Sequence, residues 1–162
     1  MKSSSSPSNS NATKRLPAST RIAIVVSSYH DSITEKMLDA SRATLTAEGL
    51  TEKQIEIVRV PGAWEIPLAA KWIADSKKFA AIIALGAVIK GDTSHDQHIN
   101  RFVSMSLGQL GLATGIPVTF GVLTCNNLSQ ARERSGGKFG NKGSEAAEAA
   151  LAMLHLRRTI ST

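Results

Sequence analysis

Four apolar runs, each bounded by polar or glycine residues, are the dominant pattern of this sequence. The runs at 22–26 and 79–85 are apolar throughout, which is typical of strands buried on both faces of a sheet. The second segment is predicted as a strand because Ile55, Ile57 and Val60 recur among polar residues. The strongest run leads into Gly86 and then into a polar turn that ends at His95. The pattern therefore predicts strands at residues 21–28, 54–60, 79–85 and 118–124.

Between these runs, apolar residues recur every three or four positions, which predicts amphipathic helices. The first helix opens on Ser32 with Glu35 three residues later, a capping-box pattern, and closes at Gly49. Pro67 suits the first turn of the second helix, because this turn leaves its N–H groups unpaired in any case. The expected apolar faces are Ile33, Met37, Leu38 and Leu45, then Leu68, Trp72 and Ile73, then Ile99, Phe102, Val103, Leu107 and Leu110.

The end of the chain adds two helices and a glycine-rich segment. The third helix is ended by Gly115, and a short helix follows around residues 132–134. Residues 136–143 form a glycine-rich loop, and an Ala-rich helix runs from Ser144 to about Arg158.

Strands that alternate with helices predict a parallel sheet with right-handed crossovers. We therefore expect an α/β protein, a three-layer sandwich whose four-stranded parallel sheet has a flavodoxin-like order and is flanked by helices. Polar clusters follow the four strands, at 28–31, 61–65, 90–95 and 124–127. Because ligands bind at the carboxyl ends of parallel strands, these clusters predict one composite site at a single edge of the sheet.

Composition narrows the classes of function. The chain has 162 residues, enough for one domain with a sizeable core, and it contains no apolar run of membrane-spanning length. Half of the +6 net charge comes from Lys2, Lys14 and Arg15, and the other basic residues alternate with acids. We therefore predict neither a nucleic-acid nor a membrane partner. The single cysteine, Cys125, excludes an internal disulfide and a cysteine-rich zinc site.

Residues 1–20 are rich in serine and nearly free of large apolar groups. Such a segment buries too little surface to offset its ordering entropy, so we expect a disordered extension at 1–20 and one folded domain at 21–162. The segment lacks the apolar centre of a secretory signal. We expect a cytoplasmic protein, although the acid-free, Ser-rich composition leaves organellar import open.

His95 is the first candidate for catalysis, because an imidazole beyond a buried strand can relay protons in carbonyl and imine chemistry. A surface histidine at the start of a helix is the alternative interpretation. His98, three residues later, would add a second nitrogen ligand for a metal ion. No third ligand stands out in the sequence, so we predict no metal site.

A phosphate site is the second candidate. Arg134 and Lys142 flank the glycine-rich loop, and Thr93 and Ser94 offer hydroxyl groups, which together suit a phosphate. The loop lacks the glycine spacing of a Walker motif, and a flexible surface loop is the alternative.

Aromatic residues at strand exits are the third candidate. Tyr29 and Trp64 lie where a flat ring can stack on a heterocycle, whereas Phe120, inside a strand, fits core filling better. Glu65 is suited to bind a polyol, or else is a first-turn acid that complements the helix dipole.

Several long segments carry a family resemblance: VPGAWEIPLAAK (60–71), LGAVIKGDTSH (85–95), PVTFGVLT (117–124) and QARERSGGKFGNKGSEAA (130–147). In sequence, order and spacing they resemble lumazine synthase, the penultimate enzyme of riboflavin biosynthesis, over essentially residues 21–156. Several motifs in register are far more specific than any one of them alone.

The resemblance implies an enzyme that condenses 5-amino-6-(D-ribitylamino)uracil with 3,4-dihydroxy-2-butanone 4-phosphate and needs no cofactor. It implies His95 as the general acid/base, with Glu145 as a nearby supporting acid. Phe120 and Lys142 fall at positions that a neighbouring subunit contributes, which replaces the core role for Phe120. The residues implied for the pyrimidine substrate are Tyr29, His30, Ala63, Trp64, Glu65, Val88, Ile89, Lys90, Phe120 and Lys142, and those for the butanone phosphate are Asp92, Thr93 and Arg134.

The chain also departs from the family pattern. Members usually have Phe-Asn in place of Tyr29-His30, and an aromatic residue directly after the catalytic histidine, where this chain has Asp96. Trp64 replaces the commoner Phe, a tolerable enlargement. These departures leave open a second hypothesis, a non-catalytic flavin- or lumazine-binding shell protein of the same fold.

The resemblance further implies a homopentamer, because the family builds its site between subunits. We expect twelve such pentamers to form a sixty-subunit shell, since the GKFGNKG segment lacks the insertion of pentameric relatives. Pro17 argues against the shell, because it suits poorly the strand that family members add to a neighbour's sheet. The resemblance also implies riboflavin synthase as a protein partner.

Overall fold

The computed structural model describes residues 15–161. Four strands form one all-parallel sheet in the order β2-β1-β3-β4, and they are β1 (Ile22–Ser27), β2 (Ile55–Val60), β3 (Ala81–Ile89) and β4 (Val118–Cys125). The predicted α/β fold with its flavodoxin-like order is thereby confirmed. The helices are α1 (Asp31–Ala47), α2 (Ile66–Asp75), α3 (His95–Thr114), α4 (Leu128–Arg134) and α5 (Lys142–Ile160), with 3₁₀ turns η1 (Glu52–Gln54) and η2 (Ala63–Glu65).

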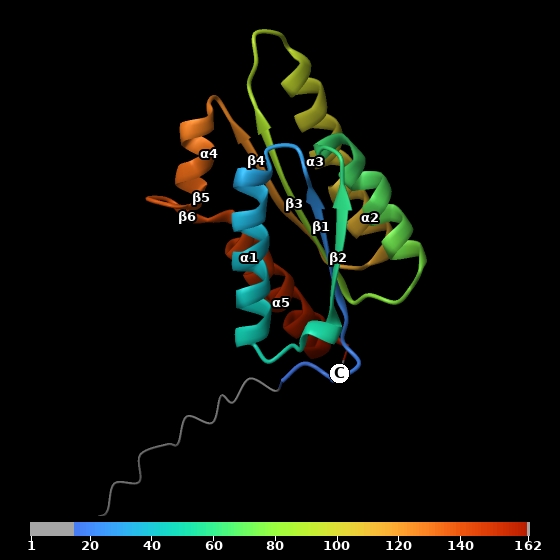
Figure 1. Ribbon diagram of the computed structural model, residues 1–162. Coiled ribbons are helices and arrows are strands. Elements are labelled where there is room, and N and C mark those ends of the chain that lie inside the picture. Colours follow the sequence, from blue (N-terminus) through green and yellow to red (C-terminus); the bar gives the residue numbers. More distant parts are fainter. Residues whose placement is uncertain (1–14, 162) are drawn as a thin grey trace, which may run out of the picture.

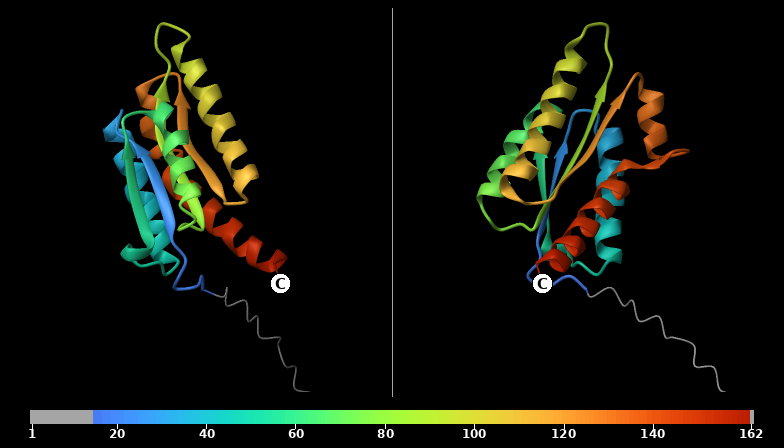
Figure 2. Two further views of the ribbon diagram at one scale, coloured as in Figure 1. Left: turned by 90° about the vertical axis from the view of Figure 1, so that its right-hand side faces the viewer. Right: turned by 180° about the vertical axis from the view of Figure 1, so that it is seen from behind.

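Helices cover both faces of the sheet and make three layers. In Figures 1 and 2, α1 and α5 lie side by side on one face, while α2 and α3 cover the other. All four strands point the same way, so their carboxyl ends meet at the edge drawn at the top of Figure 1. Ligands of open α/β sheets bind at this edge.

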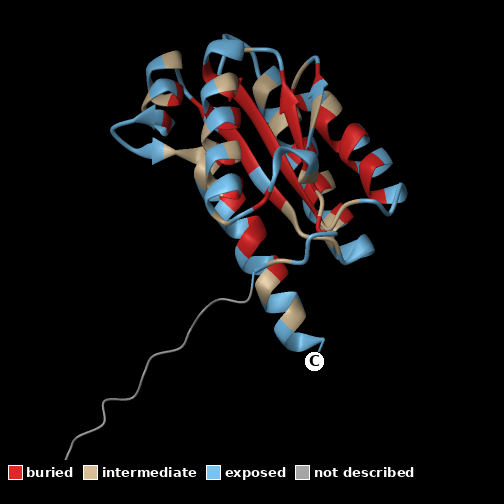
Figure 3. Ribbon diagram, turned by 60° about the horizontal axis from the view of Figure 1, so that its bottom comes forward, coloured by how far each residue is buried: buried red, intermediate tan, exposed pale blue. Residues whose placement is uncertain are grey.

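Two apolar clusters hold the layers together, one on each face of the sheet. The larger joins the sheet to α1 and α5, and the smaller joins it to α2 and α3. Because strands of a parallel sheet are covered on both faces, every residue of β1 is buried. Figure 3 shows this arrangement, with buried strands between helices whose outer faces are exposed.

The first helix starts differently from the predicted capping box. It begins at Asp31, with His30 as its N-cap residue in the left-handed conformation and without a side-chain capping bond. Ser32 therefore lies inside the helix, and Glu35 pairs with Arg59 of β2 instead of closing a box. The predicted apolar face (Ile33, Met37, Leu38 and Leu45) is buried as expected, and Gly49 follows the helix with a φ of 100°.

The apolar face predicted for α2 is wrong for two of its three residues. Leu68 and Trp72 are 54% and 65% exposed, and only Ile73 is buried. Three of the six buried residues of α2 are alanines, and their small side chains let this short helix lie close to the sheet. Pro67 does lie in the first turn, as predicted.

The glycine-rich segment is more ordered than the predicted loop. Residues 135–141 form a small antiparallel hairpin, β5 (Ser135–Gly137) and β6 (Gly140–Asn141), and α5 begins at Lys142 instead of Ser144. The Asn141 side chain caps this helix by accepting from the Gly143 N–H at 2.8 Å. A Cβ on Gly143 would lie 1.9 Å from the Met37 carbonyl oxygen, so only glycine allows α5 to approach α1 this closely.

Residues 15–20, predicted as part of the N-terminal extension, already contact the folded domain. Leu16 packs against the larger core cluster, and the Arg15 carbonyl accepts a hydrogen bond from Arg158 at 3.1 Å. Thr20 is buried and its N–H donates to the Pro17 carbonyl at 2.9 Å. The rest of the predicted disordered extension, residues 1–14, lies outside the described residues.

Candidate active site

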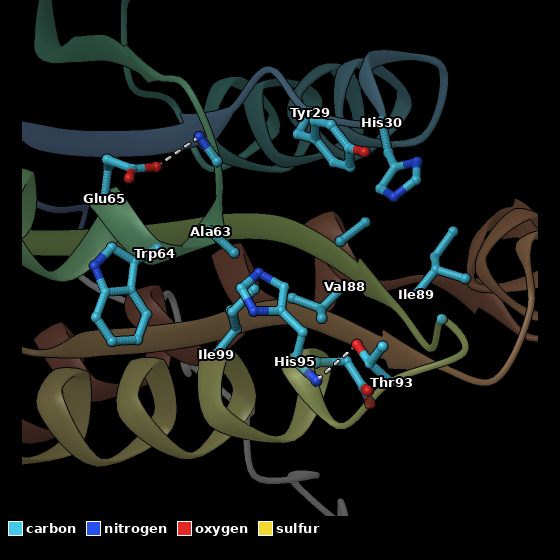
Figure 4. Close-up of a pocket in the computed structure, with 14 residues that line it drawn as sticks. Tyr29, His30, Ala63, Trp64, Glu65, Val88, Ile89, Thr93, His95 and Ile99 are labelled. Carbon is cyan, nitrogen blue, oxygen red and sulfur yellow. Dashed lines mark hydrogen bonds between the residues drawn. The ribbon is translucent and has the colours of Figure 1, made fainter.

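A hollow of about 390 Å³ opens at the carboxyl ends of β1, β2 and β3, between η2 and the first turn of α3. We call it the acidic hollow, because Glu65 and Asp96 line it and no lysine or arginine among the described residues does. Figure 4 draws its lining side chains. They are Tyr29, His30, Gly62, Ala63, Trp64, Glu65, Ala87, Val88, Ile89, Gly91, Thr93, His95, Asp96 and Ile99.

Tyr29 and His30 form the wall that follows β1. Backbone hydrogen bonds fix this exit, because the Tyr29 N–H donates to the Pro61 carbonyl at 2.9 Å. The Thr34 hydroxyl donates to the Ser27 carbonyl at 2.8 Å and ties the start of α1 to the end of β1. His30 has a φ of 61°, a conformation that non-glycine residues adopt mainly where function or tight packing requires it. The two rings meet edge to face, with centroids 4.6 Å apart.

Trp64 and Glu65 come from η2, which follows β2. The Gly62 N–H donates to Glu65 Oε2 at 2.9 Å, so one carboxylate oxygen is already engaged. The Trp64 ring lies over Phe102 of α3, with centroids 4.0 Å apart and planes at 30°. This contact links η2 to α3 and leaves Trp64 49% exposed to the hollow and the solvent.

His95 is the first residue of α3 and lies just beyond the turn that follows β3. Its backbone N–H donates to the Thr93 hydroxyl at 3.4 Å, while its side chain is exposed. In Figure 4 the imidazole points into the middle of the hollow, between Trp64 and Val88, with Tyr29 on the opposite side. An exposed imidazole in this position is free to exchange protons with a bound molecule.

A second hollow, of about 450 Å³, lies beside the edge strand β4, between α4, the hairpin and α5. We call it the basic hollow, because Arg134 and Lys142 outnumber its one acid, Glu145. Lys142 Nζ contacts Glu145 Oε2 at 2.8 Å, whereas the Arg134 guanidinium lies over the Phe139 ring, 5.0 Å from its centroid. The lining residues are Phe120, Val122, Leu123, Thr124, Cys125, Arg134, Phe139, Lys142 and Glu145.

Cys125 forms part of the wall of the basic hollow at the end of β4. Burial raises the pKa of its thiol, and the positive charge of Arg134 lowers it, the first effect being the larger. The thiol therefore stays protonated at neutral pH and is a poor nucleophile.

Most of the residues predicted as the site line one of these two hollows, but a single chain does not bring them together. Phe120, Arg134, Lys142 and Glu145 lie in the basic hollow, and the other lining residues predicted lie in the acidic one. Lys90 and Asp92 line neither hollow, and both are exposed. The prediction of one composite site is therefore wrong for the polar cluster at 124–127, whose Thr124 and Cys125 face the basic hollow because β4 is an edge strand beside α4.

The core role that the place of Phe120 inside a strand suggested is wrong. Phe120 is 40% exposed, on the open side of the edge strand. Other lining residues had no chemical signal in the sequence, since Gly62, Ala87, Gly91 and Ile99 contribute backbone or apolar surface only. In the sequence, the signal for Asp96 is that it stands where family members usually have an aromatic residue.

The described residues hold no group of three histidine, cysteine, aspartate or glutamate side chains that suits a metal ion. His98, the second histidine of the suggested pair, is exposed and lines neither hollow. Over the same residues, no helix combines the length and the apolar character that crossing a bilayer needs.

A parallel sheet with aromatic rings, imidazoles and carboxylates in one hollow and cations in another defines an α/β protein built to bind polar small molecules. Residues 19–158 match the family model of 6,7-dimethyl-8-ribityllumazine synthase. The chain therefore belongs to this family, the lumazine synthases, which are transferases of riboflavin biosynthesis. The resemblance found in the sequence is thereby confirmed.

Proposed function

We propose that this enzyme condenses 5-amino-6-(D-ribitylamino)uracil with 3,4-dihydroxy-2-butanone 4-phosphate. The products are 6,7-dimethyl-8-ribityllumazine, phosphate and water. The observation that carries this proposal is the division of charge between the hollows, one acidic and aromatic, the other basic. The first suits a flat heterocycle with many N–H and O–H donors, and the second suits a phosphate dianion.

In this proposal the pyrimidine lies in the acidic hollow. Tyr29 or Trp64 stacks on its ring, and the free oxygen of Glu65 accepts from ribityl hydroxyls. His30, with its ring against Tyr29, takes the place of the family's asparagine beside the ribityl chain. Ala63, Val88 and Ile89 supply the remaining surface around the heterocycle. The role of Lys90, which lines neither hollow, stays a prediction from the resemblance.

The phosphate is held by Arg134 and Lys142 of the basic hollow, together with the turn that carries Asp92 and Thr93. Thr93 lines the acidic hollow, so this turn would meet the cations of a neighbouring subunit. Arg134 makes no ion pair among the described residues and is available for a bidentate contact. Lys142 already has Glu145 as its partner, so that carboxylate keeps the lysine oriented until the dianion arrives.

The chemistry follows from these positions. The pyrimidine amine attacks the ketone, a first water leaves to give an imine, and phosphate is eliminated to leave an enol that tautomerises to a second ketone. The ribitylamino nitrogen attacks this ketone and a second water leaves, which closes the ring. Each step moves a proton, and His95 is the imidazole placed to relay it. Much of the acceleration comes from holding two reactants in contact, which needs no metal ion or other cofactor.

We propose that a complete site forms between subunits of a homopentamer. The resemblance assigns Phe120 and Lys142 to a neighbour, and Arg134 shares their hollow, so the same neighbour would supply all three. Exposed apolar side chains on α2, α3 and β4, such as Trp72, Met105 and Phe120, support an interface, because monomers seldom expose so many.

The larger assembly and its surroundings are further parts of this proposal. The proposal of a sixty-subunit shell rests on the short β5–β6 hairpin, which lacks the insertion of pentameric relatives. Pro17 still argues against a shell, because proline suits poorly a strand added to a neighbour's sheet. The extension before the folded domain, a cytoplasmic location and an association with riboflavin synthase stay predictions. Sedimentation of the purified protein distinguishes a monomer, a pentamer and a sixty-subunit shell directly.

The reaction is tested by mixing both substrates with purified protein and following the absorbance of the lumazine product. Product formation that depends on both substrates is the expected result. A well-folded oligomer that binds riboflavin but makes no product would contradict the enzyme and favour the non-catalytic binder. The intact cation pair in the basic hollow favours the enzyme, because a protein that only binds the product has no use for a phosphate site.

A further inference from the structure

Asp96 lies in the first turn of α3 and lines the acidic hollow beside His95. Its Oδ1 atom is buried and has no hydrogen-bond partner among the described residues. Nearly all buried polar atoms in proteins have a partner, so an orphaned acceptor indicates a donor that the isolated chain does not supply.

Asn100 repeats this feature one helical turn later. Its Oδ1 is also buried without a partner in the described chain, and the i, i+4 spacing sets both residues on one face of α3. Glu65 differs, because the Gly62 N–H already occupies one of its oxygens. Asn100 does not line the acidic hollow, so Asp96 is the residue of this pair whose unfilled acceptor belongs to the wall of the hollow.

A position in the first turn of a helix accounts for an acid at residue 96, since the helix dipole favours negative charge there. It does not account for a buried oxygen without a donor, because first-turn acids ordinarily meet solvent or the free N–H groups of the helix. No lysine or arginine lines the acidic hollow, so no cation of its wall fills the role. A bound molecule with N–H or O–H groups would supply the missing donor.

We propose that Asp96 is a specificity-determining residue that accepts a hydrogen bond from an N–H or O–H group of the pyrimidine substrate. This inference rests on the proposed function. The pyrimidine offers amine, ring N–H and polyol donors, whereas the butanone phosphate is a dianion that a carboxylate repels. Asp96 thus favours the pyrimidine at its own position in the acidic hollow.

The test compares Asp96→Leu, which removes the acceptor, with Gln97→Leu at the adjacent, exposed position outside the hollow. Binding of 5-amino-6-(D-ribitylamino)uracil is titrated by calorimetry, and the KM of each substrate is measured beside it. We expect Asp96→Leu to weaken pyrimidine binding about tenfold and to leave the KM of the butanone phosphate unchanged or lower. Gln97→Leu should change neither value.

Asp96→Asn is the second variant, because it keeps the shape and one acceptor oxygen but loses the charge. Its pyrimidine affinity should fall between those of the wild type and Asp96→Leu. Unchanged pyrimidine affinity in Asp96→Leu would overturn the proposal, as would an equal loss in Gln97→Leu. A lower kcat with unaltered binding would also overturn it, since that result assigns Asp96 to the orientation of His95. A wild type that binds the pyrimidine but makes no lumazine would refute the proposed reaction alone.

Discussion

The acidic and the basic hollow belong to one chain but differ in charge, in origin and in how they are held. The acidic hollow is built from strand exits at the carboxyl edge of the sheet, as expected for an α/β fold. The basic hollow lies beside the edge strand and depends on α4, a small hairpin and the start of α5. In the proposed function the two hollows are half-sites, each matched mainly to one reactant, that a neighbouring subunit would bring together.

The largest expected effect comes from removing Arg134, the cation of the basic hollow that has no acidic partner among the described residues. Arg134→Ala should lower kcat/KM for the butanone phosphate about a hundredfold, because a charged contact to a dianion is lost. The affinity for the pyrimidine should change little. Arg132→Ala, on the same helix but outside the hollow, is the matched control, and steady-state kinetics with each substrate varied provides the measurement. An equal loss in both variants would show that α4, and not the Arg134 charge, is responsible.

Gly143→Ala tests whether the basic hollow depends on the close approach of α5 to α1. The new Cβ would collide with the Met37 carbonyl at 1.9 Å, so the variant should lose roughly 3 kcal/mol of stability. Gly108→Ala is the control, because a Cβ there meets nothing within 4 Å and alanine favours a helix. Thermal unfolding followed by circular dichroism measures both. Similar melting temperatures for the two variants would contradict this account of the contact.

Trp64→Ala tests the aromatic wall of the acidic hollow. Loss of the ring should raise the KM of the pyrimidine about tenfold and leave the KM of the butanone phosphate unchanged. Trp64→Phe keeps a flat ring and should stay within about twofold of the wild type. If the alanine variant instead raised both KM values equally, Trp64 would act on the shape of the whole site and not on one substrate.

The smallest effect concerns the thiol at the rim of the basic hollow. Because burial raises the Cys125 pKa, alkylation by iodoacetamide at neutral pH should be slower than that of a free cysteine and should accelerate as the pH rises. Arg134→Ala removes the charge that lowers this pKa, so the pKa should rise further and the rate should fall about twofold to threefold. Faster alkylation in Arg134→Ala would contradict the lowering of the Cys125 pKa by the Arg134 charge.

The sequence predicts the sheet well and the helix faces less well. Continuous apolar runs identify the central strands β1 and β3, because burial on both faces favours apolar residues at every position. The edge strands β2 and β4 carry polar or exposed residues and are recognised from their remaining apolar positions. The face of α2 is misread, since the pattern follows the large residues Leu68 and Trp72, whereas alanines make the buried contact. A subunit interface would explain why Leu68 and Trp72 are apolar but exposed. The apolar pattern of a helix does not distinguish a face buried in such an interface from a face buried in the core.

The sequence points to the types of residue in the candidate site, but it does not predict that these residues divide between two hollows. His95, Trp64 and Arg134 are recognisable from residue type and motif, yet their separation into two hollows follows from β4 being an edge strand, which strand order alone reveals. The left-handed His30 and the 1.9 Å clearance at Gly143 depend on tertiary contacts that no local pattern encodes.

The central claim is that the acidic hollow of one subunit and the basic hollow of another form one site. It is tested most directly by co-assembling His95→Ala with Arg134→Ala, two variants that should each be nearly inactive alone. In a random equal mixture, about a quarter of the shared sites combine two intact hollows, because each half is intact with a probability of about one half. We therefore predict recovery of about a quarter of the wild-type activity in the mixed oligomer. No recovery in a verified mixed assembly would contradict the claim and assign both residues to a site within one chain.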